Sequence, residues 1–92
     1  MTIPFDSKLR VPENVLVSQI DGESVLLNLQ SECYHGLDDV GTRFWEVLTT
    51  SDSIDSAYET LRGEYDVNPA TLRSDLSELV EGLVRSGLVE VA

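Results

Sequence analysis

The first third of the chain alternates between apolar and polar residues in the manner of an antiparallel sheet. Residues 15–20, VLVSQI, are rich in β-branched side chains and predict a strand. The Asp-Gly pair at 21–22 suits the positive φ angles of a tight hairpin turn, so residues 24–30 are expected to return as a second strand. A turn at 31–32 leads to a short third strand over 33–35. This pattern predicts a three-stranded meander, which needs a helical layer for stability.

The returning strand has one apolar side and one mixed side. Val25, Leu27 and Leu29 point to the same side, because side chains alternate along a strand. Leu26 shares the opposite side with an asparagine and a glutamine. The alternation therefore predicts that the side of Leu26 is mostly solvated, and that Val25, Leu27 and Leu29 form the apolar face of the sheet.

After the third strand, the apolar period changes to that of helices. A first helix is expected over residues 39–48, with acidic residues at its start, where they favour the helix dipole. Ser53 is the expected N-cap of a second helix that ends at Gly63. Asn68-Pro69 starts a third helix, since asparagine caps well and proline fits the first turn, and Ser86-Gly87 ends it.

The two ends of the chain carry weaker signals. Residues 1–13 are polar and contain two prolines, so they are expected to form a loosely held arm. Val89 and Val91 predict a short tail strand, and the pattern leaves open whether it covers the free edge of the third strand. The chain is thus predicted to be a single α+β domain over residues 1–92, with a three-stranded antiparallel sheet followed by three helices.

The third helix has a wider apolar stripe than one packing surface needs. At about 100° per residue, its apolar positions span roughly 140° of the helix surface. They are Leu72, Leu76, Leu79, Val80, Leu83 and Val84. Either the helix packs in a corner between two neighbours, or part of the stripe lines a groove.

The charge of the chain excludes some partners. Its 17 acidic and 6 basic residues give a net charge of −11, and no two of the bases are adjacent. A phosphate-binding surface needs clustered lysine and arginine, so neither nucleic acid nor an anionic membrane is an expected partner. The lone cysteine fits a reducing compartment, and no signal peptide or membrane-length apolar run of about 20 residues is present, so a cytoplasmic protein is expected.

Only one pair of residues offers candidate catalytic chemistry. Cys33 and His35 would point to the same side of a strand, and a Cys–His nucleophile pair is conceivable there. Only Glu32 or Asp38 lies near enough in sequence to orient the histidine. Two ligands do not make a zinc site, the acidic residues lack the spacing of a calcium loop, and the glycines are dispersed. We therefore expect a non-catalytic protein with no metal and no cofactor.

The order of these segments resembles that of the PqqD-like family, in particular the stand-alone recognition proteins of lasso-peptide biosynthesis. The resemblance runs through LNLQSECYHGLDDVGTRFWEVL, a second helix ending in EYDV and a last helix ending in SGLVE. The family pattern joins an extended aromatic segment, a leucine and an acid, a Gly-Thr pair and an aromatic-rich helix. Here those positions are Tyr34, Leu37, Asp38, Gly41, Thr42 and Trp45. The resemblance implies a relative of the winged helix-turn-helix fold.

The resemblance also implies a function. Members of this family, known as RiPP recognition elements, bind the leader segment of a ribosomally made precursor peptide and are not enzymes. They present the leader to processing enzymes, which for lasso peptides are a leader-cleaving cysteine peptidase and an ATP-dependent cyclase. In the family, the leader adds as a strand to the third strand and packs against the third helix. The corresponding residues here are Cys33, Tyr34, His35, Leu72, Asp75, Leu76 and Leu79.

The sequence leaves two other functions open. A PqqD-like peptide chaperone that serves a radical SAM maturation enzyme would have the same pattern. A winged-helix DNA-binding protein would share the fold, although the net charge of −11 opposes phosphate binding. The sequence also leaves open which amides of residues 33–35 face a bound peptide.

Overall fold

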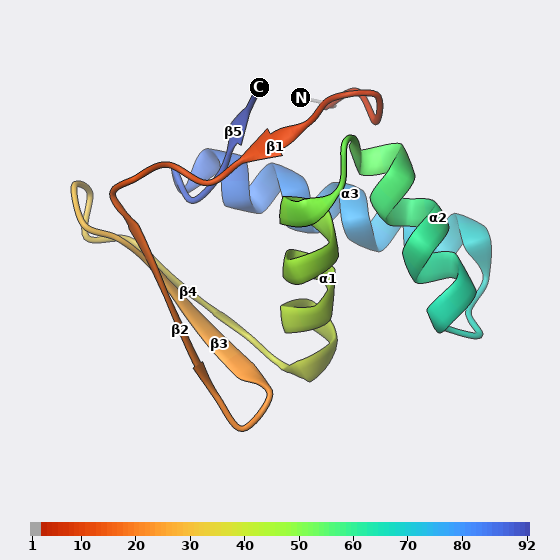
Figure 1. Cartoon of the computed structure of the whole chain (residues 1–92), viewed down its shortest axis with the longest axis horizontal. Helices are drawn as coiled ribbons and strands as arrows, with labels where there is room; N and C mark the ends of the chain where they lie inside the picture. The colour runs from red at the N-terminus through yellow and green to blue at the C-terminus, as the bar shows by residue number, and fades with distance from the viewer. Residues whose placement is uncertain (1–2) are drawn as a thin grey trace.

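The chain folds into a three-stranded antiparallel sheet with three helices, as the computed structural model in Figure 1 shows. The structure describes residues 3–92. The sheet has the order β2-β3-β4, formed by Val15–Ile20, Glu23–Asn28 and Tyr34–Leu37. The helices α1 (Asp39–Thr50), α2 (Ile54–Glu64) and α3 (Pro69–Arg85) follow. The predicted α+β fold is confirmed.

Local signals set most of these boundaries. Asp21 and Gly22 have φ angles of 54° and 81°, as both central residues of a two-residue hairpin turn require. The side chains of Asp38, Ser53 and Asn68 each accept a hydrogen bond from a backbone N–H of the first turn of the helix that follows. These caps lie where the sequence places the helix starts.

The prediction for the two sides of β3 is wrong. Leu26 is 0% exposed and belongs to the core, whereas Val25 on the opposite side is 49% exposed. Ser24 and Asn28 lie on the side of Leu26 and are also buried. The apolar side of this strand therefore faces solvent, and its mixed side faces the helices.

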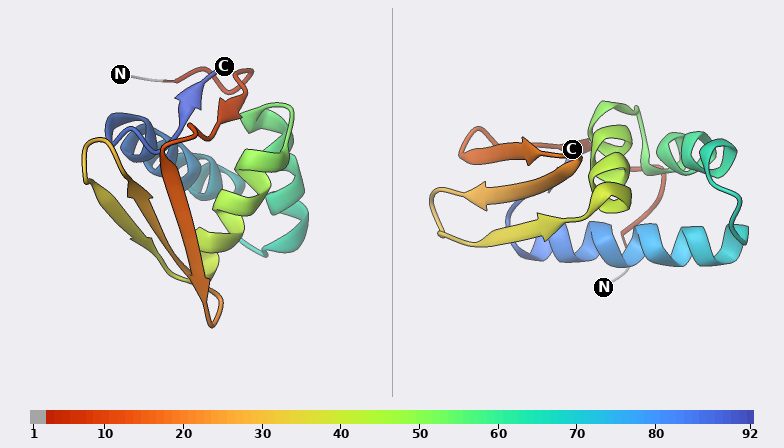
Figure 2. Two further views of the ribbon diagram at one scale, coloured as in Figure 1. Left: turned by 60° about the vertical axis from the view of Figure 1, so that its left-hand side comes forward. Right: turned by 90° about the horizontal axis from the view of Figure 1, so that it is seen from below.

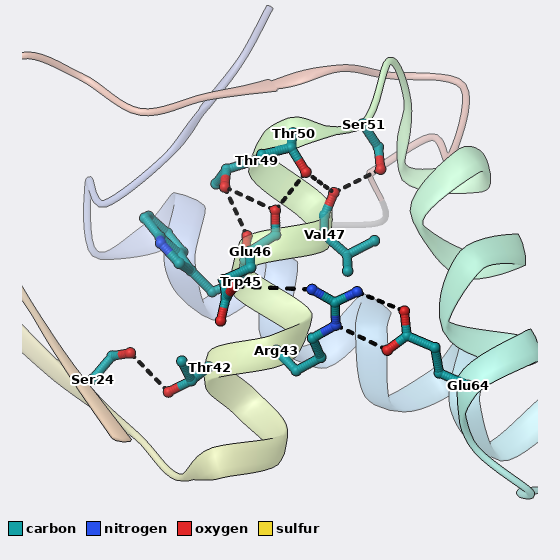
Figure 3. A network of polar contacts seen from close by, with 10 residues as sticks. All are labelled: Ser24, Thr42, Arg43, Trp45, Glu46, Val47, Thr49, Thr50, Ser51 and Glu64. Atoms are coloured by element: carbon teal, nitrogen blue, oxygen red, sulfur yellow. Dashed lines mark hydrogen bonds and ion pairs between the residues drawn. The ribbon is translucent and has the colours of Figure 1, made fainter. Parts of the chain in front are cut away.

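Hydrogen bonds across the core explain this reversal. Ser24 Oγ lies 2.7 Å from Thr42 Oγ1 of α1, as Figure 3 shows. Asn28 Nδ2 donates to the carbonyl oxygen of Gly87 at 2.7 Å, and Asn28 Oδ1 accepts from the backbone N–H of Gln30 and Ser31. Buried polar side chains with partners cost little, so this side can enter the core.

Two leucine truncations test this assignment of the faces. Leu26→Ala should lower the free energy of unfolding by about 2–5 kcal/mol, because it leaves a cavity in the core. Leu16→Ala makes the same change on the solvent side of β2, where Leu16 is about half exposed, and should cost less than about 1 kcal/mol. Urea denaturation measures both variants. Equal losses would contradict the assignment.

The N-terminal arm is not loose over the described residues. Its Ile3 and Leu9 are buried, and the backbone N–H groups of Ile54 and Asp55 donate to carbonyl oxygens of residues 7 and 5. The arm thus holds the first turn of α2, whose N–H groups lack partners within the helix. Residues 1–2 of the predicted arm lie outside the described residues.

The ends of the described chain pair with each other. β1 (Leu9–Arg10) and β5 (Glu90–Val91) form a separate two-stranded antiparallel sheet, and the side chains of Arg10 and Glu90 form an ion pair. The predicted tail strand is therefore present, and it lies against the arm and away from β4.

Helix α1 connects the sheet to the other helices. The hydroxyl of Thr42 in α1 is hydrogen-bonded to Ser24 of β3. The next residue, Arg43, donates from Nε and Nη2 to the carboxylate of Glu64 in α2, at 2.9 and 2.7 Å (Figure 3). This hydrogen bond lowers the pKa of Glu64. Because both partners are solvent-accessible, the pair fixes the approach of α2 to α1 more than it adds stability.

Candidate functional site

The outer edge of β4 is open. β4 is the last strand of its sheet, and within residues 3–92 no strand pairs with that edge. The view from below in Figure 2 shows β4 as the strand drawn nearest to α3. An open edge exposes backbone N–H and C=O groups that can pair with an added strand.

One hydrogen bond defines which groups face outward. The backbone N–H of Asn28 donates to the carbonyl oxygen of Cys33 at 2.8 Å, so Cys33 directs its carbonyl toward β3. Polar groups of successive residues alternate between the two edges of an antiparallel strand. His35 therefore also faces β3, while Tyr34 and Gly36 direct their N–H and C=O groups to the open edge.

The sequence pattern does not include Gly36 in the strand, because glycine there indicates the end of the strand. The hairpin loop after β3 includes Glu32 with a φ angle of 62°, and β4 begins only at Tyr34 and runs to Leu37. The strand is therefore shifted toward the C-terminus relative to the predicted 33–35. A register count from the loop at residues 29–32, which places Cys33 opposite Asn28 and therefore Gly36 opposite Val25, is the signal that includes Gly36.

The side chains of the predicted strand segment point to different sides. Tyr34 pairs with Leu27 and lies on the solvent side of the sheet, 76% exposed. His35 pairs with Leu26 and is half-buried on the side of the helices. Cys33 is exposed just before β4, contrary to the buried position usual for a free cysteine. Within residues 3–92, His35 has no side-chain hydrogen bond that would orient its imidazole.

The predicted residues of α3 divide into two groups. Leu72 and Leu76 are buried in the core, which leaves their side chains no surface to offer a peptide. Asp75 is exposed and Leu79 half-buried. On a helical projection these two lie on one flank of the buried stripe, and Arg73 and Ser77 lie on the other.

The N-terminal arm covers only one flank of α3. Ile3, Pro4 and Phe5 line a hollow together with Arg73 and Ser77. The guanidinium of Arg73 lies 4.0 Å from the centre of the Phe5 ring. The flank with Asp75 and Leu79 lies outside this hollow. Most of the wide stripe thus packs in the core, and Leu79 at its border is partly exposed.

No metal centre is formed by the described residues, since no three histidine, cysteine, aspartate or glutamate side chains among them cluster in a way that could hold an ion. None of the helices over residues 3–92 has the length and apolar character needed to cross a membrane. At β4 and α3, the accessible features are the strand edge at Tyr34 and Gly36 and the flank at Asp75 and Leu79.

The family model of coenzyme PQQ synthesis protein D (PqqD) matches residues 23–89, which include the whole of this site. The chain belongs to the PqqD family. Two solved structures are similar. TbiB1 in complex with the TbiA(beta) leader peptide shares 33% identity, with a TM-score of 0.80 over 88% of this chain and 94% of that chain.

The second structure is a lasso peptide synthetase B1 complexed with the leader peptide. It shares 26% identity with a TM-score of 0.79, over 90% of this chain and 98% of that chain. A comparison with curated proteins finds no match. The identity, coverage and TM-scores agree with the predicted resemblance to a PqqD-like recognition element.

Proposed function

We propose that this chain is a single PqqD-like domain that binds the leader segment of a ribosomally synthesised precursor, of the lasso-peptide class, by strand addition to β4. The open edge with outward-facing groups of Tyr34 and Gly36 carries this proposal. Both similar structures are complexes with leader peptides, which supports the same ligand class here.

The site acts by backbone pairing and side-chain contact. An added strand exchanges hydrogen bonds with Tyr34 and Gly36, and these bonds do not depend on the peptide's side chains. Peptide side chains on the helix side meet His35, Asp75 and Leu79, which supply selectivity. Leu72 and Leu76 support that flank from the core. The protein is a non-catalytic cytoplasmic scaffold that presents the leader to a cysteine peptidase and an ATP-dependent cyclase.

A titration with a fluorescently labelled leader peptide tests this function. Saturable one-to-one binding is expected for the leader and none for a scrambled peptide of the same composition. Backbone amide NMR signals of Tyr34, Gly36 and Leu79 should shift on binding. The double variant Cys33→Ser with His35→Ala should leave peptidase turnover within a few-fold at saturating leader, since neither side chain does chemistry.

Duplex DNA at about 50 mM salt provides the counter-test, because electrostatic binding is strongest at low ionic strength. Salt-sensitive DNA binding without leader binding would replace the proposal with the winged-helix alternative. The family match also supports a second candidate ligand, a precursor peptide that is modified by a radical SAM maturation enzyme. Titrating both leaders against the same protein distinguishes the two pathways.

A further inference from the structure

The solvent side of the three-stranded sheet is apolar, and no element within residues 3–92 covers it. Its large side chains, which we call the outer face, are Leu16, Ile20, Val25, Leu27 and Tyr34. Ile20 is 71% exposed, and Leu16 and Val25 are about half exposed. Figures 1 and 2 show the three helices on the other side of the sheet. Contiguous apolar surface of this kind on a small domain marks an interaction site more often than chance.

Carboxylates surround one end of the outer face. Ile20, Val25 and Gly36 line a shallow hollow together with Asp21, Glu23 and Asp38. Residues 11–42 contain six acidic residues and neither lysine nor arginine. In the part of the chain that the structure describes, Asp21 and Glu23 form no ion pair, because the paired arginines all meet acids elsewhere. The negative potential of this rim is uncompensated.

The outer face is continuous with the strand edge of the proposed peptide site. Tyr34 belongs to the outer face through its side chain and to the edge through its backbone. Gly36 likewise lines the hollow and directs its N–H to the edge. A peptide strand added to β4 would extend the outer face by one strand, with alternate side chains on that side. A partner seated on the outer face would therefore touch the bound peptide as well.

We propose that the outer face docks the enzyme that processes the peptide held on β4, through an apolar surface ringed by lysine and arginine. This inference rests on the proposed function. The acidic rim selects a basic partner through charge complementarity. It opposes a second copy of this chain, because two acidic rims would meet, and it opposes an anionic membrane for the same reason.

Two matched valine substitutions test the docking surface. Val25→Glu places a carboxylate in the centre of the outer face, and Val67→Glu makes the same change at a site of equal exposure, 47% against 49%, in the connection between α2 and α3. The assay is cleavage of the full precursor by the leader peptidase of the same pathway, with this protein as the titrated component. Val25→Glu should lower the cleavage efficiency about tenfold or more, and Val67→Glu should not change it.

Leader affinity and thermal unfolding of each variant are measured in parallel. Ile20→Glu, beside the exposed turn, provides a second probe in case Val25→Glu fails to fold. Loss of cleavage with leader affinity unchanged supports the docking surface. Unchanged cleavage in a folded variant overturns it and leaves the proposed leader binding standing, whereas a wild-type protein that binds no leader overturns the proposed function itself.

The rim is tested separately by charge reversal. Glu23→Lys should slow recruitment of the peptidase and weaken the dependence of its rate on salt, because rim charges act mainly on association rates. Asp66→Lys, an equal change of charge outside the sheet, is the control and should have little effect. If Glu23→Lys recruits the peptidase faster than the wild type does, the proposal of a basic partner surface is wrong. If the wild-type protein is a dimer and Val25→Glu dissociates it, the outer face binds a second copy of this chain and the proposal that it binds the enzyme is wrong.

Discussion

Gly36→Pro is expected to leave the domain folded and to weaken leader binding at least fivefold. The outward N–H of Gly36 has no partner in the sheet, so its loss costs no internal hydrogen bond. It removes a hydrogen bond to the added strand, worth about 1 kcal/mol, and the proline ring also obstructs the approach of that strand. Isothermal titration calorimetry with the leader peptide measures the loss.

Two control variants separate backbone pairing from other effects. Gly36→Ala keeps the N–H, and its added Cβ meets no atom within 4 Å, so it should bind like the wild type. His35→Pro removes an N–H that faces β3 and should reduce the stability of the sheet itself. If Gly36→Pro binds the leader as tightly as Gly36→Ala, strand addition at this edge is wrong.

Leu76→Asp is expected to unfold the domain or nearly so. Leu76 is 0% exposed in the middle of α3, so the substitution buries a carboxylate without a partner and leaves a cavity. The combined cost of more than about 4 kcal/mol is comparable to the whole stability of a small domain, about 5–10 kcal/mol. Circular dichroism during thermal and urea denaturation measures it.

Leu79→Asp is the matched variant one turn further along α3. Leu79 lies half-buried at the border of the core, so the domain should remain folded at 25 °C. Its carboxylate on the proposed peptide side should weaken leader binding about tenfold. A folded Leu76→Asp variant with weak leader binding would instead return Leu76 to the surface of the site.

The sequence predicted the three-stranded sheet and the three helices well because their ends depend on local chemistry, but it did not predict β1 in the arm. Asn68-Pro69 and Ser53 start helices through contacts within a few residues, and the Asp-Gly turn needs only its own φ angles. The order of strands and helices follows from such signals without knowledge of tertiary contacts. The charge argument likewise needs only composition.

The faces of β3 were not predictable, since they depend on partners distant in sequence. Asn28 enters the core because it bonds to Gly87, 59 residues away, and Ser24 because Thr42 lies opposite. The α3 part of the candidate site was not predictable for the same reason. An apolar stripe on α3 does not reveal that Leu72 and Leu76 belong to the core, or that the arm covers one flank, until the arm and sheet are placed.

The pairing of β1 with β5 brings the beginning and the end of the fold together. The guanidinium of Arg10 bonds to Glu90, 80 residues away, so the points where the chain enters and leaves the fold lie side by side. A unit with this property can be carried within a surface loop of a larger protein, or reopened at the exposed turn of residues 21–22, with its internal contacts kept. The proposed binding surfaces could therefore be transferred with the domain, because β4 and the outer face lie away from the β1–β5 pair, where another chain would be joined.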